Sequence, residues 1–398
     1  MLTSLLSFLL KGETMPKMAP LKWREPQYDL DAQEDLFTAE EVAERNAKEV
    51  AANEAGLKLV KEAGFIALPL YADDLDGEPY EGETWVHPDF EPSRAEGFFE
   101  RHGMHYNIYV PSYERAQTAA TLKMLEEFGA TNWYVAVDPS QFEAYSKEYP
   151  LHRIIIRDIN FRRERLLDLN SSIASPDSMH GHAGICNFLL AFSRSMRERR
   201  YWTMDDDIMC LALKAHKGDE PAPLDGVYNK DDYYRCSRIR EEYGFNFQSF
   251  MEDMENVARA TRNAGFIGLE KFGLVFRLPV MWKLGTRVYS FYLSDNKTQV
   301  THLGQHNNDV ITSLELSKHG LVNCLFEGIG YHSGATQTAG GQTEVYKKFG
   351  TLDKGKVLVR AQPNFSKISY EYSRIHHSVD YNTHNKARVV GSPVGEED

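Results

Sequence analysis

The stretch YWTMDDDI, residues 201–208, places three consecutive aspartates at the end of a buried-strand pattern. Neighbouring carboxylates at such a position repel one another and are costly to desolvate, so they indicate a nearby positive charge. A divalent cation supplies that charge well, because hard carboxylate oxygens suit Mg²⁺ or Mn²⁺. Proteins usually hold Mg²⁺ through one or two carboxylates and substrate phosphates, which favours a phosphate-bearing substrate. An acidic turn in solvent is the alternative.

The chain before this stretch alternates between strand and helix patterns. Strand patterns cover residues 105–113, 133–138 and 153–158, and helix patterns cover residues 115–129, 139–149 and 185–200. This spacing predicts an α/β fold, with a mixed, mostly parallel sheet and helices on both faces. Such sheets bind ligands at the carboxyl ends of their strands. Polar residues stand at those ends, namely Ser112–Arg115, Asp138 and Asp205–Asp207.

The patterns are less regular in the rest of the chain. We expect helices at residues 39–63, 247–263 and 309–320, and strands at residues 273–282 and 287–295. Residues 71–100 are acidic and rich in glycine and proline, which predicts a loop.

The net charge of the 398 residues is −13, from 45 basic and 58 acidic side chains. This balance argues against a nucleic-acid partner, because phosphate contacts need local positive charge. However, residues 1–100 contain 9 of the basic and 22 of the acidic side chains, so the rest of the chain is neutral. Basic residues cluster at 157–165, 194–200 and 345–390. The charge balance therefore does not exclude a surface that binds nucleic acid, although runs of basic residues more commonly form the solvated face of a helix.

The composition is that of a soluble globular protein, with 42% hydrophobic and 26% charged residues. Its four cysteines are widely spaced, which favours a reducing compartment such as the cytoplasm. Because no apolar run approaches the roughly 20 residues of a membrane span, we expect no membrane insertion.

Further candidate site residues lie in four motifs. VPSYERA (110–116) forms a turn after the first strand, and HNNDVITSLELSKHG (306–320) carries Asp309 in the first turn of a helix, where it also favours the helix dipole. GGQTEVYKKFGT (340–351) joins a glycine turn to Lys347 and Lys348, a plausible phosphate-binding loop. SRIHHSVDY (373–381) contains paired histidines.

Together these stretches resemble the TET/JBP-associated glycosyltransferases, a family with the GT-A (Rossmann-like) fold. The family includes phage enzymes that add sugars to hydroxymethylated pyrimidines in DNA and the kinetoplastid base J glucosyltransferase. The resemblance covers about residues 105–382, and the three aspartates and the RIHHSVDY stretch are its most specific parts. Two positions depart from the family pattern: Asn308 replaces a glutamate, and Cys186-Asn187 stands where Arg-Asn is usual.

The resemblance implies a UDP-sugar donor and a bound Mn²⁺ or Mg²⁺ ion. Asp207 would ligate the metal, Asp205 would face the metal's waters or the ribose, and a late histidine would complete the site: His332, His376 or His377. Asp309 would be the general base, with inversion at the anomeric carbon. The residues implied in nucleotide binding are Pro111, Ser112, Tyr113, Arg115, Asp138, Asp205, Asp206, Lys347 and Lys348.

The resemblance further implies transfer of glucose or arabinose to 5-hydroxymethylcytosine or 5-hydroxymethyluracil in phage DNA, in the cytoplasm of the infected cell. We divide the chain into an acidic N-terminal extension with one helix (1–100) and a GT-A domain (101–390). Within the domain, residues 101–210 form the nucleotide-sugar half and residues 211–390 the acceptor half. A glycan, lipid, protein or small-molecule acceptor remains an alternative, as does a binding protein or an iron oxygenase that uses the late histidines.

Overall fold

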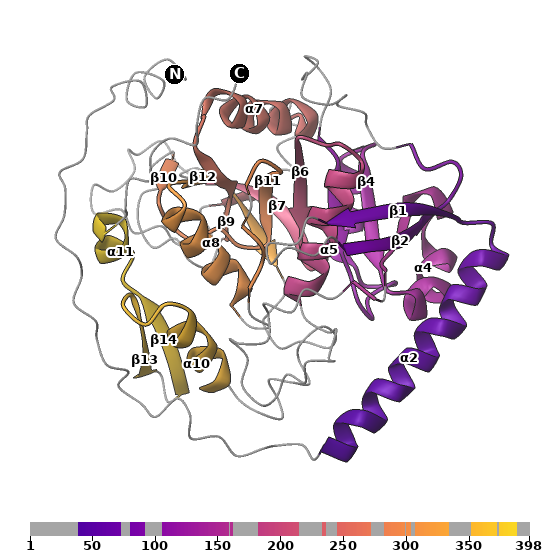
Figure 1. Ribbon diagram of the computed structural model, residues 1–398. Helices are drawn as coiled ribbons and strands as arrows, with labels where there is room; N and C mark the ends of the chain where they lie inside the picture. Colours follow the sequence, from indigo (N-terminus) through magenta and orange to yellow (C-terminus); the bar gives the residue numbers. More distant parts are fainter. Residues whose placement is uncertain are drawn as a thin grey trace, which may run out of the picture.

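The protein is built around one large mixed sheet, seen in a computed structural model (Figure 1). The structure describes residues 39–72, 80–91, 106–158, 160–161, 182–214, 233–235, 245–271, 282–298, 300–303, 307–333, 352–371 and 374–387. Among these residues the sheet has twelve strands, in the order β1-β2-β5-β4-β3-β6-β11-β9-β12-β7-β8, with β10 paired to β12.

The centre of the sheet is parallel. Its strands are β5 (Ile154–Ile156), β4 (Trp133–Val137), β3 (Ile108–Pro111) and β6 (Arg200–Met204), and every residue in them is buried. Burial on both faces explains their nearly continuous apolar sequences, which made these four strands predictable. Their carboxyl ends lie at one edge of the sheet, which brings the residues after β3, β4 and β6 to the same edge.

Helices cover both faces of this central region, as expected. Ile108 and Val110 pack in one core with residues of α3 (Ala120–Glu127) and α7 (Phe247–Ala260). Tyr109, between them in β3, packs in a second core with residues of α5 (His182–Ser195). Because successive side chains of a strand point to opposite faces, the two cores lie on opposite sides of the sheet. The α/β fold with a mixed sheet is therefore confirmed.

The second half of the sheet is largely antiparallel. It contains β11 (Phe291–Asp295), β9 (Ala264–Lys271), β12 (Val322–Ser333), β7 (Ile208–Lys214), β8 (Tyr233–Arg235) and β10 (Trp282–Leu284), and β9 with β12 is its parallel pair. The sequence did not indicate β9, because two glycines interrupt it. One of them, Gly268, lies where a Cβ atom would be 2.3 Å from the Phe291 carbonyl oxygen. Of the strand expected at 273–282, all residues before Trp282 lie outside the described residues.

The N-terminal region contributes strands to the same sheet. Helix α2 (Ala39–Glu62) was expected, whereas β1 (Ile66–Ala72) and β2 (Tyr80–Val86) were not. β2 pairs with β5, and the buried Thr84 hydroxyl donates to the Ile156 carbonyl at 2.8 Å. The loop prediction is therefore wrong at residues 80–86, because the alternating acidic residues of β2 concealed its strand character. The domain boundary near residue 100 stays a prediction.

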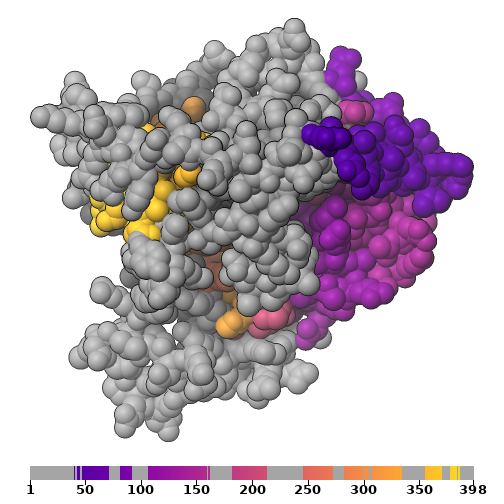
Figure 2. Space-filling view, turned by 90° about the horizontal axis from the view of Figure 1, so that it is seen from below, coloured from indigo at the N-terminus to yellow at the C-terminus, as the bar shows by residue number. Residues whose placement is uncertain are grey.

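A small C-terminal unit packs beside the sheet. β13 (Ser366–Glu371) and β14 (Arg374–Val379) form a hairpin next to α10 (Leu352–Ala361), followed by α11 (Tyr381–Ala387). Val357 and Leu358 of α10 pack against residues of α8 (Asn308–Lys318), including Val310 and Ile311. The described C-terminal and N-terminal segments lie on opposite sides of the molecule (Figure 2).

Helix α2 is fastened to the sheet through the turn that follows β4. The Ser140 backbone N–H donates to Asn53 Oδ1 at 3.1 Å, and a Cβ atom at Gly56 would lie 2.0 Å from the Pro139 carbonyl oxygen. Glycine at residue 56 is therefore what allows the helix to approach this backbone.

We expect Gly56→Ala to lower the free energy of unfolding by about 1–3 kcal/mol, because overpacking forces the helix away. Without the close approach the substitution should instead stabilise the protein, because alanine exceeds glycine in intrinsic helix propensity by about 1 kcal/mol. Chemical denaturation measures the change, with Ala55→Val on the exposed face of α2 as the control. A Gly56→Ala protein as stable as the wild type would contradict the close approach.

Candidate active site at the carboxyl end of the sheet

The three aspartates form the connection between β6 and β7, and their backbone is held at several points. Thr121, at the start of α3, donates its N–H to the Asp206 carbonyl at 3.2 Å and its hydroxyl to the Asp205 carbonyl. The same hydroxyl accepts the Ile208 N–H at 2.8 Å. On the other side, the Asp205 N–H donates to the Ser290 carbonyl at 2.7 Å. These contacts fix the backbone from which the three carboxylates project.

The middle aspartate points into the protein. Asp206 pairs with the Arg115 guanidinium at 2.5 Å and accepts a hydrogen bond from the Ser112 hydroxyl at 2.6 Å. Burial raises the pKa of Asp206 and outweighs the opposite effects of Arg115 and Ser112. Tyr145 contacts Ser112 through its hydroxyl, which also accepts the Arg115 N–H at 3.3 Å. The structure thus joins the VPSYERA turn to the aspartates.

The outer two aspartates have different surroundings from Asp206. Burial, together with Asp205 and Asp206, raises the pKa of Asp207 to about 6. Asp205 Oδ1 is buried and accepts no hydrogen bond, although His182 Nε2 lies 3.2 Å away. These are carboxylates that a cation would stabilise.

Asp309 lies near the same residues. It stands in the first turn of α8, where its Oδ1 accepts the Val310 N–H at 2.8 Å. Burial raises the pKa of Tyr331, and the charges of Asp205 and Asp309 raise it further. Burial alone would lower the pKa of His182, but Cys186, Asp205 and Asp309 together hold it well above its usual value. Asp205 and Asp309 therefore share two neighbours, Tyr331 and His182.

Asp138 is held in a buried ion pair at the end of β4. Its Oδ1 lies 2.7 Å from Arg157 Nε, and the two side chains are 6% and 5% exposed. The side chain does not cap the helix that follows. Arg157 belongs to the basic cluster at residues 157–165, and its charge is buried against Asp138 instead of lying on the surface.

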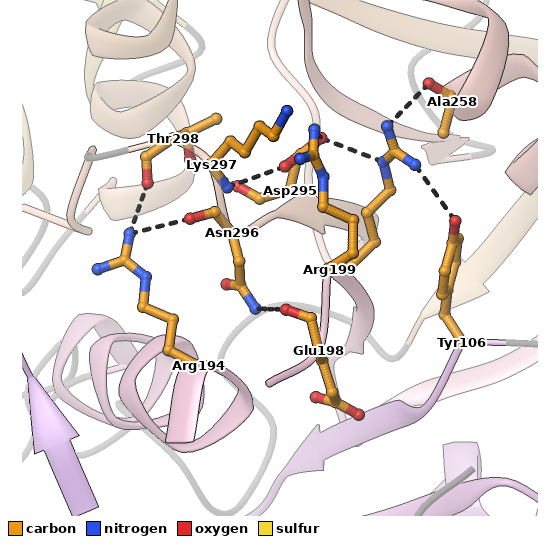
Figure 3. Close-up of polar contacts among 10 residues, drawn as sticks. Tyr106, Arg194, Glu198, Arg199, Ala258, Asp295, Asn296, Lys297 and Thr298 are labelled. Carbon is orange, nitrogen blue, oxygen red and sulfur yellow. Dashed lines mark hydrogen bonds and ion pairs between the residues drawn. The ribbon is translucent and has the colours of Figure 1, made fainter. Parts of the chain in front are cut away.

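Most of the second basic cluster is also engaged inside the protein (Figure 3). Arg199 and Arg200 both pair with Asp295, at 2.9 and 3.1 Å. Arg194 donates to the Thr298 carbonyl at 2.6 Å. Of the four arginines at residues 194–200, only Arg197 is exposed. These contacts fasten the start of β6 and the end of α5 to the segment after β11.

The histidine candidates lie in different parts of the fold. In β12, His332 is opposite Cys210 and Ser333 is opposite Ile208, so His332 is near the aspartate connection. His376 and His377 belong to β14, where His377 lies against Gly355 of α10. Lys347 and Lys348 lie outside the described residues. Among the residues that the structure describes, no three His, Cys, Asp or Glu side chains form a ready metal site.

Two residues of this site were missed from the sequence. His182 precedes the helix pattern recognised at 185–200, yet it is the first residue of α5. Glu270 is buried at the end of β9, and its charge contributes to raising the pKa of Tyr331 after burial and Asp205. Polar residues at the ends of predicted strands were the signal used to find site residues. Glu270 escaped it because β9 was not predicted as a strand.

We expect Asp206→Ala to lower the free energy of unfolding by about 3 kcal/mol, because it leaves the Arg115 charge without its buried partner. Asp253→Ala on the exposed face of α7 is the control, and we expect it to change stability by less than about 0.5 kcal/mol. Urea denaturation measures both changes. Equal stability of the two variants would contradict an internal role for Asp206.

Asp207 makes the stability of the metal-free protein depend on pH. Its pKa of about 6 in the folded state exceeds the value of about 3.9 for an unfolded aspartate. The folded state therefore binds the proton more tightly, and this contribution is present below pH 4 and lost as the pH rises to about 6.

We accordingly expect Asp207→Asn to raise the melting temperature of the metal-free protein relative to wild type, with the difference growing between pH 4 and pH 6. Thermal melts in a chelating buffer measure it, with Asp253→Asn as the control. A difference that does not change with pH would show that Asp207 titrates normally.

A family model matches the part of the chain that contains these residues. The model of the family described as TET-Associated Glycosyltransferase matches residues 106–342, which include the three aspartates, the VPSYERA turn and Asp309. No curated protein matches the chain. None of the described helices is long and apolar enough for a membrane span. Since the matched segment is more than half of the chain, the protein belongs to the TET-associated glycosyltransferases and is a transferase enzyme.

Proposed function

We propose that this enzyme moves glucose or arabinose from a UDP-sugar to the hydroxymethyl group of 5-hydroxymethylcytosine or 5-hydroxymethyluracil in DNA. The reaction would belong to phage DNA hypermodification, in the cytoplasm of the infected cell. One observation carries the proposal: in a chain of this glycosyltransferase family, the charges of Asp309 and Asp205 act on the same two side chains, His182 and Tyr331.

Asp205 and Asp207 are the residues that would hold a Mn²⁺ or Mg²⁺ ion. The buried Asp205 Oδ1 without a hydrogen bond and the raised pKa of Asp207 both fit carboxylates that need a cation. Asp206 is excluded from this role, because Arg115 and Ser112 occupy its oxygens. When bound, the ion would stabilise the negative charge that develops on the UDP leaving group.

The turn after β3 and the end of β4 would bind the nucleotide. Arg115 is 18% exposed and uses one of its nitrogens for Asp206, so its other N–H groups can contact a phosphate. Tyr113 is partly exposed in the same turn and can stack on the base. Asp138, oriented by Arg157, would accept a hydrogen bond from the uridine, and Lys347 and Lys348 would add phosphate contacts.

Asp309 would act on the acceptor. It removes the proton from the hydroxymethyl oxygen, and that oxygen attacks the anomeric carbon while the bond to the UDP oxygen breaks. The product is a glycosylated base with inverted configuration, together with UDP. In duplex DNA the base must leave the stack to bring its hydroxymethyl group to Asp309.

The test is an assay in which the purified protein receives UDP-glucose or UDP-arabinose, MnCl₂ and an oligonucleotide with one hydroxymethylated pyrimidine. Mass spectrometry of the digested nucleosides should show one added sugar, and none on unmodified DNA. We expect Asp309→Asn and Asp207→Asn to lower the rate at least about 100-fold. Asp253→Asn should keep the full rate.

Two outcomes would overturn parts of the proposal. Sugar transfer to a glycan, protein or small molecule, with none to hydroxymethylated DNA, would replace the acceptor. An Asp309→Asn enzyme with the wild-type rate would show that a different group removes the proton.

A further inference from the structure

We infer that His182, from the start of α5, is a protein ligand of the metal ion and binds it together with Asp205. This inference rests on the metal-dependent transfer proposed above and identifies the histidine of that site. It replaces the late histidines with a residue that precedes the aspartates in the chain.

The spacing of the two side chains fits ligation of one ion. His182 Nε2 lies 3.2 Å from Asp205 Oδ1. In octahedral coordination with metal–ligand distances of about 2.1 Å, adjacent ligand atoms are about 3 Å apart. The nitrogen and the oxygen can therefore occupy neighbouring positions around an ion with little movement of either side chain.

The contact between them is not a well-aligned hydrogen bond. Asp205 Oδ1 is buried and accepts no hydrogen bond, despite the nearby imidazole. Cys186, one helical turn further along α5, also acts on the imidazole and helps to raise its pKa.

Helix α5 gives His182 a rigid base. The Asn187 side chain holds the backbone of His302 with two hydrogen bonds, at 2.9 and 2.7 Å. The Cys186 thiol contacts the Tyr292 hydroxyl of β11 at 3.5 Å. The His182 and Asp205 side chains are themselves 30% and 29% exposed, so an ion can reach them from solvent.

The donor set also predicts which ion is bound. Carboxylates accept Mg²⁺ and Mn²⁺, whereas an imidazole nitrogen favours a transition-metal ion. No three His, Cys, Asp or Glu side chains converge among the described residues, so Asp207 would have to move to join His182 and Asp205. The donor's phosphate oxygens would supply further ligands. We therefore expect tighter binding of Mn²⁺ than of Mg²⁺, and tighter binding of Mn²⁺ when UDP is present.

Pulsed electron paramagnetic resonance of Mn²⁺ tests the inference, because a coordinated imidazole couples its ¹⁴N nucleus to the electron spin. The wild-type protein with MnCl₂ and UDP should show this coupling. His182→Ala should remove it and weaken Mn²⁺ binding at least about tenfold. His332→Ala and His319→Ala, the latter on an exposed residue, should retain both.

The results separate this inference from the proposed function. Absence of ¹⁴N coupling in the wild-type protein, or coupling that persists in His182→Ala, overturns the role of His182, even where sugar transfer to DNA is observed. Coupling that depends on His182 supports it, even where no sugar reaches DNA. Near-ultraviolet circular dichroism checks that His182→Ala is folded. Absence of ¹⁴N coupling in the resonance spectrum of the wild-type protein overturns the inference without any variant.

Discussion

Electrostatic repulsion among Asp205, Asp206 and Asp207 is the constraint around which the site is arranged. The fold separates the three charges by giving each carboxylate a different environment. Asp206 is turned inward and paired with Arg115, Asp205 lies 3.2 Å from His182, and burial together with the other two aspartates raises the pKa of Asp207 to about 6. A divalent cation beside Asp205 and Asp207 would reduce the repulsion between these carboxylates.

Holding three like charges together requires a firm backbone, and the backbone contacts join the two halves of the protein. Thr121 fixes the aspartates from α3 in the first half, and Ser290 fixes them from the residue before β11 in the second. β7 then leads from Asp207 along β12, a strand of the second half. The connection that carries the charges is therefore also where the first and second halves of the protein meet.

The sequence predicted the elements that have a clear local pattern of apolar residues. It did not predict the strands and contacts that depend on pairing between distant parts of the sheet. The central strands were predictable because they are buried on both faces, as in β4. β2 was missed because its alternating acidic residues resemble a loop, although Thr84 is buried. The pairing of Asp138 with Arg157 depends on the register of β4 with β5, which no local pattern shows. His182 reaches Asp205 only through the packing of α5.

The arginine contacts bear on where DNA could bind. A run of basic residues attracts phosphates only when its charges reach solvent, and Arg157, Arg199 and Arg200 are instead paired with internal aspartates. Moving them to a phosphate would leave Asp138 and Asp295 as unpaired buried carboxylates, at a cost of several kcal/mol each. If the proposed acceptor is DNA, its backbone would instead be contacted by exposed basic residues, such as Arg197 after α5 and Lys367 in the basic C-terminal segment. Lys367 belongs to the unit that packs on α8, the helix that carries Asp309, so an acceptor held there would lie on the side of the proposed general base.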